Sequence, residues 1–207
     1  MDKVFSDQAC SGLVWLPEVG IGYYPVKQSE MPYDAEYFAR YQERAQTAIG
    51  RALTQARIDL VARHYQGEVL DVGIGCGQFV DARSGTNGYD VNPAGVDWLL
   101  ARGKYRDLYD GEYAACTFWD SLEHIVDPAE AVRHVRQWAF VSIPIFDDAT
   151  HCLRSKHFRR NEHIWYFEDR GIRWWFEQQG FECVEANEME TALGREGIGS
   201  YAFRRVK

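Results

Sequence analysis

Cysteine is scarce in this 207-residue chain, and none of its five cysteines forms a C-x-x-C pair. That scarcity excludes a zinc ribbon and a disulfide framework, and it favours a reducing, cytoplasmic compartment. Long apolar runs are also missing: the longest, near residues 138–146, contains a proline and is too short to cross a bilayer. The first residues lack the pattern of a signal peptide. We therefore expect a cytoplasmic protein without a membrane segment.

Positive charge is also in short supply, with 23 Lys and Arg against 31 Asp and Glu and a net charge of -8. This balance disfavours broad, unspecific binding to nucleic acid, which requires cations opposite the phosphates. One basic run, residues 154–160, leaves a local nucleic-acid contact open. The length and the 46% hydrophobic content predict one domain with a real core. We assign residues 33–207 to that domain and residues 1–32 to an N-terminal arm or lid.

Glycine is concentrated in one stretch, residues 68–79, which reads Glu-Val-Leu-Asp-Val-Gly-Ile-Gly-Cys-Gly-Gln-Phe. A short apolar run predicts a buried parallel strand, and the alternate glycines predict a tight turn into a helix N-terminus. The dinucleotide fingerprint G-x-G-x-x-G is not met because its third glycine position is Gln78, and a P-loop Gly-Lys-Ser/Thr is absent. Asp71 would repel a pyrophosphate, but it suits a ligand with an ammonium group and a sulfonium charge.

A second acid follows nineteen residues after Asp71, in the stretch Gly-Tyr-Asp-Val-Asn-Pro at residues 88–93. We expect a strand that ends at Asp90, whose carboxylate can accept hydrogen bonds from both hydroxyls of a ribose. The paired motifs resemble those of the class I S-adenosylmethionine-dependent methyltransferases of the type 11/23 group, which includes ubiquinone-pathway O-methyltransferases. The resemblance covers about residue 33 to the C-terminus. The alternative is an ordinary doubly wound domain whose glycines serve only the turn.

The resemblance implies S-adenosylmethionine as the cofactor and a Rossmann-like α/β sandwich. Its sheet would be mainly parallel and seven-stranded, with an antiparallel last strand. Ligands of such sheets bind beyond the carboxyl ends of the strands. The cofactor-binding residues implied are Asp71, Gly73, Gly75, Gly77, Asp90, Val91, Asp107 and Asp120.

Hydrophobic periodicity and capping residues agree with alternating strands and helices. Residues 146–163 show no clear period, and a loop of that length is usually functional or disordered. Helices are predicted over residues 35–41, 50–65, 77–82, 93–102, 128–137 and 168–179. Strands are predicted over residues 68–72, 88–90, 105–108, 112–120, 138–145, 181–186 and 201–206.

Candidate chemistry follows the predicted strand 112–120, where Asp120, Glu123 and His124 form a D-x-x-E-H pattern. In a helical turn these positions share one face and suit a divalent ion, Mg²⁺ or Mn²⁺. The pattern is similar to the E-x-x-E-H of ubiquinone-pathway O-methyltransferases and of small-RNA 3′-terminal 2′-O-methyltransferases, which implies a metal that also binds the acceptor hydroxyl. Here the first acid is one methylene shorter. His163 could complete the set.

Three roles remain open for the catalytic candidates Glu123, His124 and His163: metal ligand, proton-accepting base, or lining of the pocket. The leading hypothesis is methyl transfer to an oxygen or nitrogen of a small-molecule acceptor. A second hypothesis makes the acceptor RNA or DNA, through residues 154–160 and the neighbouring aromatic pair 165–166. A third is a protein that binds S-adenosylmethionine without turnover. The sequence identifies neither the acceptor nor the oligomeric state.

Overall fold

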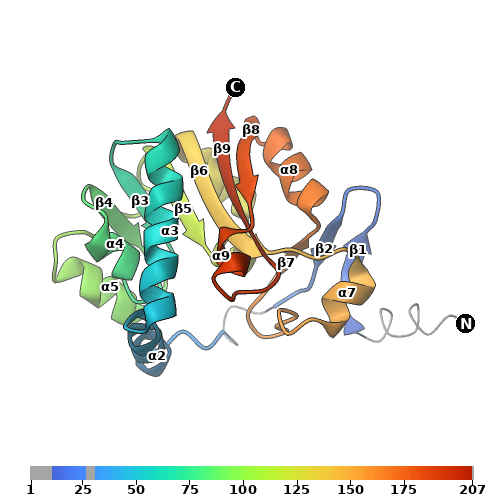
Figure 1. Cartoon of the computed structure of the whole chain (residues 1–207), viewed down its shortest axis with the longest axis horizontal. Coiled ribbons are helices and arrows are strands. Elements are labelled where there is room, and N and C mark those ends of the chain that lie inside the picture. The colour runs from blue at the N-terminus through green and yellow to red at the C-terminus, as the bar shows by residue number, and fades with distance from the viewer. Residues whose placement is uncertain (1–10, 27–30, 207) are drawn as a thin grey trace, which may run out of the picture.

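A computed structural model describes residues 11–26 and 31–206 of the chain (Figure 1). Its main sheet has six strands in the order β4-β3-β5-β6-β9-β8. The first four strands in that order are parallel, and β9 is antiparallel to both of its neighbours. The predicted α/β architecture with an antiparallel last strand is confirmed. The strands are β3 (Val69–Val72), β4 (Thr86–Tyr89), β5 (Tyr113–Trp119), β6 (Val135–Pro144), β8 (Phe181–Asn187) and β9 (Ile198–Arg205).

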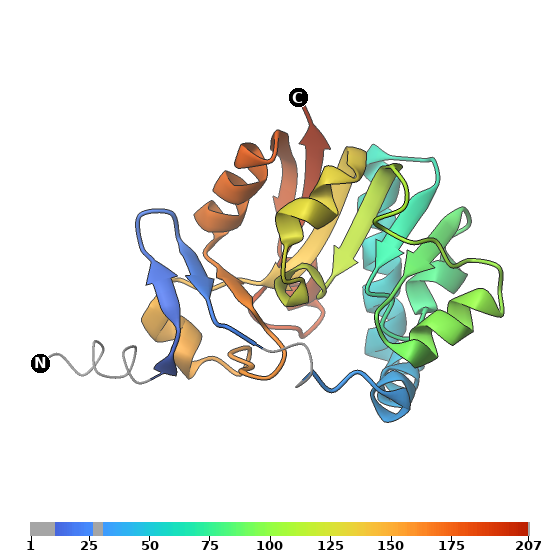
Figure 2. The ribbon, with the colours of Figure 1, turned by 180° about the vertical axis from the view of Figure 1, so that it is seen from behind.

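Helices cover both faces of this sheet because its central strands carry apolar side chains on both sides. Figure 1 shows α3 crossing the front of the sheet, and Figure 2 shows α6 (yellow) and α8 (orange) on the opposite face. Along β6, Phe140 packs in the cluster under α3, whereas Val141 packs in the cluster under α6 and α8. The helices are α2 (Ala35–Ala45), α3 (Ala48–His64), α4 (Gln78–Ala82), α5 (Pro93–Leu100), α6 (Pro128–Arg133), α7 (Ala149–Arg154), α8 (Asp169–Gln178) and α9 (Met189–Ala192).

The sheet has six strands instead of the seven expected, because residues 105–108 do not form a strand. They contribute one isolated parallel bridge, between Gly88 and Tyr105. The carboxylate of Asp107 accepts a 2.8 Å hydrogen bond from the backbone N–H of Tyr109, which turns the chain away from β4. The strand prediction at this position was therefore wrong.

Two further segments differ from the predictions, one in the length of a helix and one by containing a helix. The helix expected over residues 128–137 ends at Arg133, because the chain enters β6 at Val135. The stretch 146–163 contains a helix, α7, that the sequence pattern did not predict. Asp148 starts it by accepting a 2.7 Å hydrogen bond from the N–H of His151.

A second, three-stranded antiparallel sheet joins the described part of the N-terminal region to the segment before α8. It consists of β1 (Val14–Leu16), β2 (Ile21–Tyr23) and β7 (Trp165–Phe167), with β2 in the centre. Trp15 and Tyr166 lie in one buried cluster with Phe146. Two strands, β1 and β2, therefore lie in this region. The boundary at residue 33 and the lid role remain predictions.

Among the described residues, no helix combines the length and the apolar character that a membrane crossing requires. The four cysteines in the described ranges, Cys76, Cys116, Cys152 and Cys183, are free thiols.

Candidate functional site

The glycine turn between β3 and α4 depends on all three of its glycines. Gly73, Gly75 and Gly77 have φ angles of 77°, 58° and 79°, a region that side-chain-bearing residues rarely adopt. A β-carbon on Gly73 would lie 2.6 Å from the β-carbon of Ser121, and one on Gly77 would lie 2.4 Å from the ring of Trp98. The turn therefore presents bare backbone beyond the tip of β3.

Asp71 lies beneath this turn and is only 1% exposed. Its Oδ1 accepts a 2.6 Å hydrogen bond from the hydroxyl of Thr117 on β5. Burial raises the pKa of Asp71 to about 7, against the opposing effects of Thr117 and of the Arg57 charge. A cation bound at the turn would favour the ionised carboxylate.

Asp90 follows the tip of β4, as predicted, and faces the same edge of the sheet. Its Oδ1 accepts a 2.7 Å hydrogen bond from the N–H of Asn92. Burial raises the pKa of Asp90 to about 6, while the backbone N–H groups of Asn92, Ile74 and Val91 stabilise the charged form. The Ile74 contact ties the acid to the glycine turn. Val91 beside it is 63% exposed, an apolar side chain free to meet a ligand.

Asp107 is close to β4 through the bridge of Tyr105 to Gly88, so it lies near the predicted cofactor edge. One carboxylate oxygen accepts from the N–H of Tyr109, and the other receives a weak 3.5 Å contact from the hydroxyl of Tyr105. The second oxygen thus retains hydrogen-bonding capacity.

Asp120 follows the tip of β5 and is the one non-glycine residue with a positive φ in the described ranges, at 54°. Arg57 binds its carboxylate at 2.9 Å, and Arg195 binds both of its oxygens at 2.7 and 2.9 Å. These two guanidinium groups hold the pKa of Asp120 well below its usual range. Both also bind Glu190, whose side chain is fully buried. Asp120 is therefore committed to an ion-pair network.

The sequence pattern gave no signal for the partners in this network. Arg57 lies 63 residues before Asp120, and Arg195 lies 75 residues after it. Neither arginine stands in a recognisable motif.

Glu123, His124 and His163 do come together. The first two lie in the short 3₁₀ helix η2 (Leu122–His124) after β5. The N–H of Ile164 donates a 2.8 Å hydrogen bond to the carbonyl of Glu123, which brings His163 alongside. One potential ligand atom from each of the three side chains lies within 4.8 Å of the others, and this set does not include Asp120. The two imidazole rings meet edge to face at 4.6 Å.

This cluster contains buried polar atoms without hydrogen bonds. Glu123 is 1% exposed, and within the described part of the chain neither of its carboxylate oxygens has a hydrogen-bond partner. The same holds for Nδ1 of His163. Unsatisfied buried groups are costly and need an explanation such as a proton, a water or an ion. One carboxylate and two imidazoles form a donor set that fits a divalent cation.

The protonation states in the cluster follow from its burial. Burial raises the pKa of Glu123 well above its usual value, with the Asp120 charge adding to the effect. Burial lowers the pKa of His124 to about 4 and that of His163 well below its usual value. At neutral pH both imidazoles are therefore neutral, and each has a lone pair for a metal or for a hydrogen-bond donor.

Tyr33, which lies just before α2, contacts the cluster of Glu123, His124 and His163 through His124. Its hydroxyl lies 2.9 Å from Nδ1 of His124, although the two residues are 91 positions apart. Its ring packs edge to face against Tyr37 of α2 at 5.4 Å. The sequence gave no indication of a contact between Tyr33 and His124.

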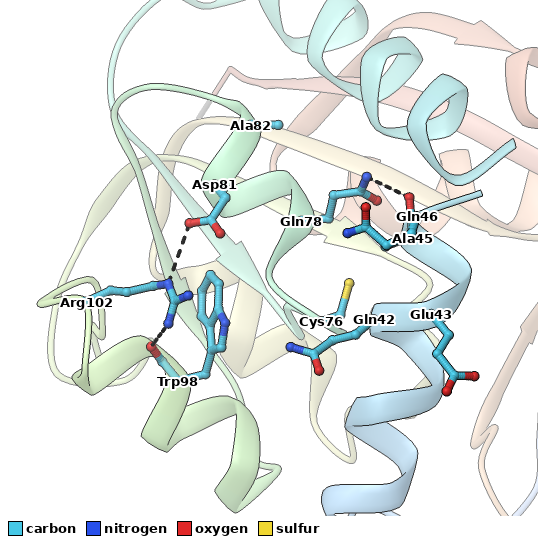
Figure 3. A pocket seen from close by; sticks show the side chains of 10 residues that line it. All are labelled: Gln42, Glu43, Ala45, Gln46, Cys76, Gln78, Asp81, Ala82, Trp98 and Arg102. Atoms are coloured by element: carbon cyan, nitrogen blue, oxygen red, sulfur yellow. Dashed lines mark hydrogen bonds and ion pairs between the residues drawn. The ribbon is translucent and has the colours of Figure 1, made fainter. Parts of the chain in front are cut away.

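A separate cavity of about 610 Å³ lies between α2, α4 and α5 (Figure 3). Cys76 and Gln78 line it on the side of the glycine turn, and Trp98 and Arg102 line it on the side of α5. None of the predicted site acids or histidines contributes to it. It lies behind the turn and outside the group of strand tips.

Comparisons with known proteins agree with this geometry. A family model described as a methyltransferase domain matches residues 38–186. No curated protein matches the chain significantly. Magnesium protoporphyrin IX methyltransferase from Synechocystis PCC 6803, solved with S-adenosylhomocysteine, superposes with a TM-score of 0.56 at 17% identity, covering 84% of this chain and 96% of that one.

Two other solved structures show the same fold. The protein bound to the Trm112 methyltransferase activator of Haloferax volcanii has a TM-score of 0.59 at 14% identity, covering 83% of this chain and 97% of that one. The [4+2]-cyclase SpnF has a TM-score of 0.55 at 15% identity, covering 98% and 91%. None of the three is named as a ubiquinone-pathway enzyme, so that finer resemblance stays a prediction.

The glycine turn, the acid at the tip of β4 and the family match lead to one conclusion. The chain belongs to the methyltransferase domain family and is a class I methyltransferase with S-adenosylmethionine as its cofactor.

Proposed function

We propose that this enzyme transfers the methyl group of S-adenosylmethionine to an oxygen or nitrogen of a small-molecule acceptor. The observation that carries the proposal is the buried cluster of Glu123, His124 and His163 beyond the tip of β5. The cofactor would lie across the neighbouring tips of β3 and β4, with the sugar held by Asp90. A methyl donor and a proton acceptor would then meet at the same edge of the sheet.

Methyl transfer from a sulfonium is an in-line displacement that needs alignment and no covalent enzyme intermediate. The S–CH₃ bond breaks as the bond from the acceptor atom to the methyl group forms, and S-adenosylhomocysteine leaves. An acceptor hydroxyl must also lose its proton, and a neutral imidazole can take it. Nδ1 of His124 contacts the hydroxyl of Tyr33, and the ring has a further hydrogen-bond partner in the backbone of Glu162.

As an alternative to a base role for His124, the donor set fits a divalent cation, which Glu123, His124 and His163 would hold. Asp120, included in the ligand set predicted from the sequence, is committed to Arg57 and Arg195. Of the two ions expected, Mn²⁺ suits a set with two imidazoles better than Mg²⁺ does. When bound, such an ion would lower the pKa of the acceptor hydroxyl.

A small acceptor is favoured over nucleic acid because the basic run 154–160 is partly neutralised. Arg159 pairs with Glu162 at 3.1 Å, and Lys156 pairs with Glu196 at 3.7 Å. The net charge of -8 acts in the same direction. The Synechocystis neighbour is named for a small-molecule acceptor, whereas the SpnF neighbour is named as a cyclase. The fold alone therefore does not decide turnover, and cytoplasmic location stays a prediction from composition.

Transfer of a radiolabelled methyl group into a cell extract tests the proposal. The extract is divided into small-molecule, nucleic-acid and protein fractions after incubation with labelled cofactor. We expect label in the small-molecule fraction, lost in His124→Ala and retained in His151→Ala, which changes a half-exposed histidine on α7. Label in the nucleic-acid fraction would favour the alternative acceptor. No label, from a protein that binds the cofactor, would identify a silent binding protein.

A further inference from the structure

Residues 33–34 make two contacts with residues of the proposed site, one with His124 and one with Asn92. On one side, the hydroxyl of Tyr33 lies 2.9 Å from Nδ1 of His124 in the catalytic cluster. On the other side, the amide of Asn92 donates a 2.9 Å hydrogen bond to the main-chain carbonyl of Asp34. The N–H of Asn92 binds Asp90 at the same time. Residues 33–34 therefore bridge the sugar-binding acid and the catalytic histidine.

Asn92 and Asp34, which form the second of these contacts, are each held by a further hydrogen bond. Asn92 is buried, and its side-chain oxygen caps α5 by accepting a 3.0 Å hydrogen bond from the N–H of Ala94. The side chain of Asp34 caps α2 by accepting a 2.8 Å hydrogen bond from the N–H of Tyr37. The position of the bridge is thus fixed relative to both helices. Little freedom is left for the phenol of Tyr33 other than its contact with His124.

The contact with Tyr33 bears on which nitrogen of His124 carries the proton. A neutral imidazole has one N–H and one lone pair, and the partner of one nitrogen selects the state of the other. The phenol can donate to Nδ1 or accept from it, and the backbone of Glu162 is a second hydrogen-bond partner of the ring. Nε2 lies 3.8 Å from Oε1 of Glu123, which places it inside the cluster of Glu123, His124 and His163.

We propose that Tyr33 is a positioning residue that holds His124 in a single tautomer, and that residues 33–34 couple this tautomer to the sugar-binding end of the site through Asn92. The inference rests on the proposed function of His124 but is tested without methyl transfer. Tyr33 does not touch the reacting atoms. It acts through the imidazole, in the way that outer partners orient metal-bound or catalytic histidines.

The first test measures the tautomer directly in the full-length protein. Two-bond proton–nitrogen correlation spectra of ¹⁵N-histidine-labelled protein distinguish the Nδ1–H form, the Nε2–H form and an average of the two. We expect the pattern of one tautomer for His124 in the wild type and an averaged pattern in Tyr33→Phe. An averaged pattern in the wild type, or an unchanged spectrum in Tyr33→Phe, would overturn the proposal.

Tyr37→Phe is the matched control because it removes a hydroxyl from the neighbouring ring of the same segment. That hydroxyl donates to Tyr41 at 3.1 Å and has no recorded contact with His124. We expect the His124 signal of Tyr37→Phe to match the wild type. A loss of the single-tautomer pattern in this control would mean that any loosening of the segment is sufficient, and would contradict a specific role for Tyr33.

Asn92→Ser tests the coupling to the sugar-binding end. Serine keeps an oxygen that can cap α5 but lacks the amide that reaches Asp34. We expect the His124 signal to shift toward the averaged pattern although Asn92 does not touch His124. Wild-type spectra in Asn92→Ser would refute the coupling while leaving the Tyr33 contact in place.

Turnover on the acceptor identified by the radiolabel experiment supplies a second readout. For Tyr33→Phe we expect kcat to fall about 10- to 100-fold, in the range of outer-partner changes, with affinity for S-adenosylhomocysteine unchanged. A fall in cofactor affinity with unchanged kcat would show that Tyr33 serves cofactor binding instead.

Discussion

Thr117 on β5 donates a hydrogen bond of 2.6 Å to Oδ1 of Asp71, which belongs to the neighbouring strand β3. The bond joins the strand that leads into the glycine turn to the strand that leads into the cluster of Glu123, His124 and His163. It leaves Asp71 buried in an environment that disfavours its charged form, with its pKa raised to about 7.

The first prediction concerns stability against pH. The folded pKa of Asp71 exceeds its unfolded value, so the folded state binds the proton more tightly and the stabilisation is lost as pH rises from about 4 to about 7. Over this range the unfolding free energy attributable to Asp71 should fall by up to about 4 kcal/mol. Urea denaturation of the wild type and Asp71→Asn at pH 5 and pH 7 measures the difference.

Asparagine keeps an oxygen that can accept from Thr117, so the comparison isolates the titration. Other carboxyls with a raised pKa titrate in both proteins, and the Asp90 charge is itself one of the causes that raise the pKa of Asp71. Equal losses of stability in the two proteins between pH 5 and pH 7 would show that Asp71 does not titrate in this window.

The second prediction separates two glycines of the same turn. Gly75→Ala and Gly77→Ala both force alanine to a positive φ, but only the second directs its β-carbon into the ring of Trp98. The nearest atom to a β-carbon on Gly75 is 3.5 Å away, on Tyr41. We expect Gly77→Ala to be less stable than Gly75→Ala by about 1–3 kcal/mol, because overpacking adds to backbone strain. Equal midpoints in urea would contradict the packing account.

The third prediction concerns the ion-pair network around Asp120. Glu190 is fully buried between Arg57 and Arg195, so Glu190→Gln leaves their positive charges less compensated. Breaking a buried pair in this way costs about 3–5 kcal/mol of unfolding free energy. Glu182→Gln is the control, because Glu182 pairs with Arg204 on the exposed edge of the sheet and should lose less than about 1 kcal/mol. Similar losses in both variants, measured by urea denaturation, would rule out a structural role specific to the network.

Local sequence signals predicted the parts of the fold that depend on neighbours in the chain. The helices predicted to begin at residues 35 and 128 do begin there, and Asp34 and Asp127 cap them. The glycine turn and the acid at position 90 stand at the strand tips, as expected from their motifs. The missing strand at 105–108 is also a local event, since the side chain of Asp107 captures the N–H of Tyr109. Periodicity does not report that competition.

Contacts between distant segments had no signal in the sequence. Asp120 belongs to a sequence pattern typical of metal ligands. In the structure its carboxylate accepts hydrogen bonds from Arg57 and Arg195, which are distant in the sequence. The bond of Tyr33 to His124 is equally invisible without the fold. His163 was predicted as a possible third member, and the structure brings it to Glu123 and His124. Its role there remains a prediction.

The central claim is that S-adenosylmethionine binds across the tips of β3 and β4 with its sugar on Asp90. Isothermal titration of S-adenosylhomocysteine into the wild type, Asp90→Ala and Asp97→Ala tests it most directly. Asp97 is the control because it is an exposed acid on the adjacent helix α5. We predict wild-type binding with a Kd of about micromolar order, a loss of about 1–3 kcal/mol in Asp90→Ala, and wild-type affinity in Asp97→Ala. No binding by the wild type, or undiminished binding by Asp90→Ala, would contradict it.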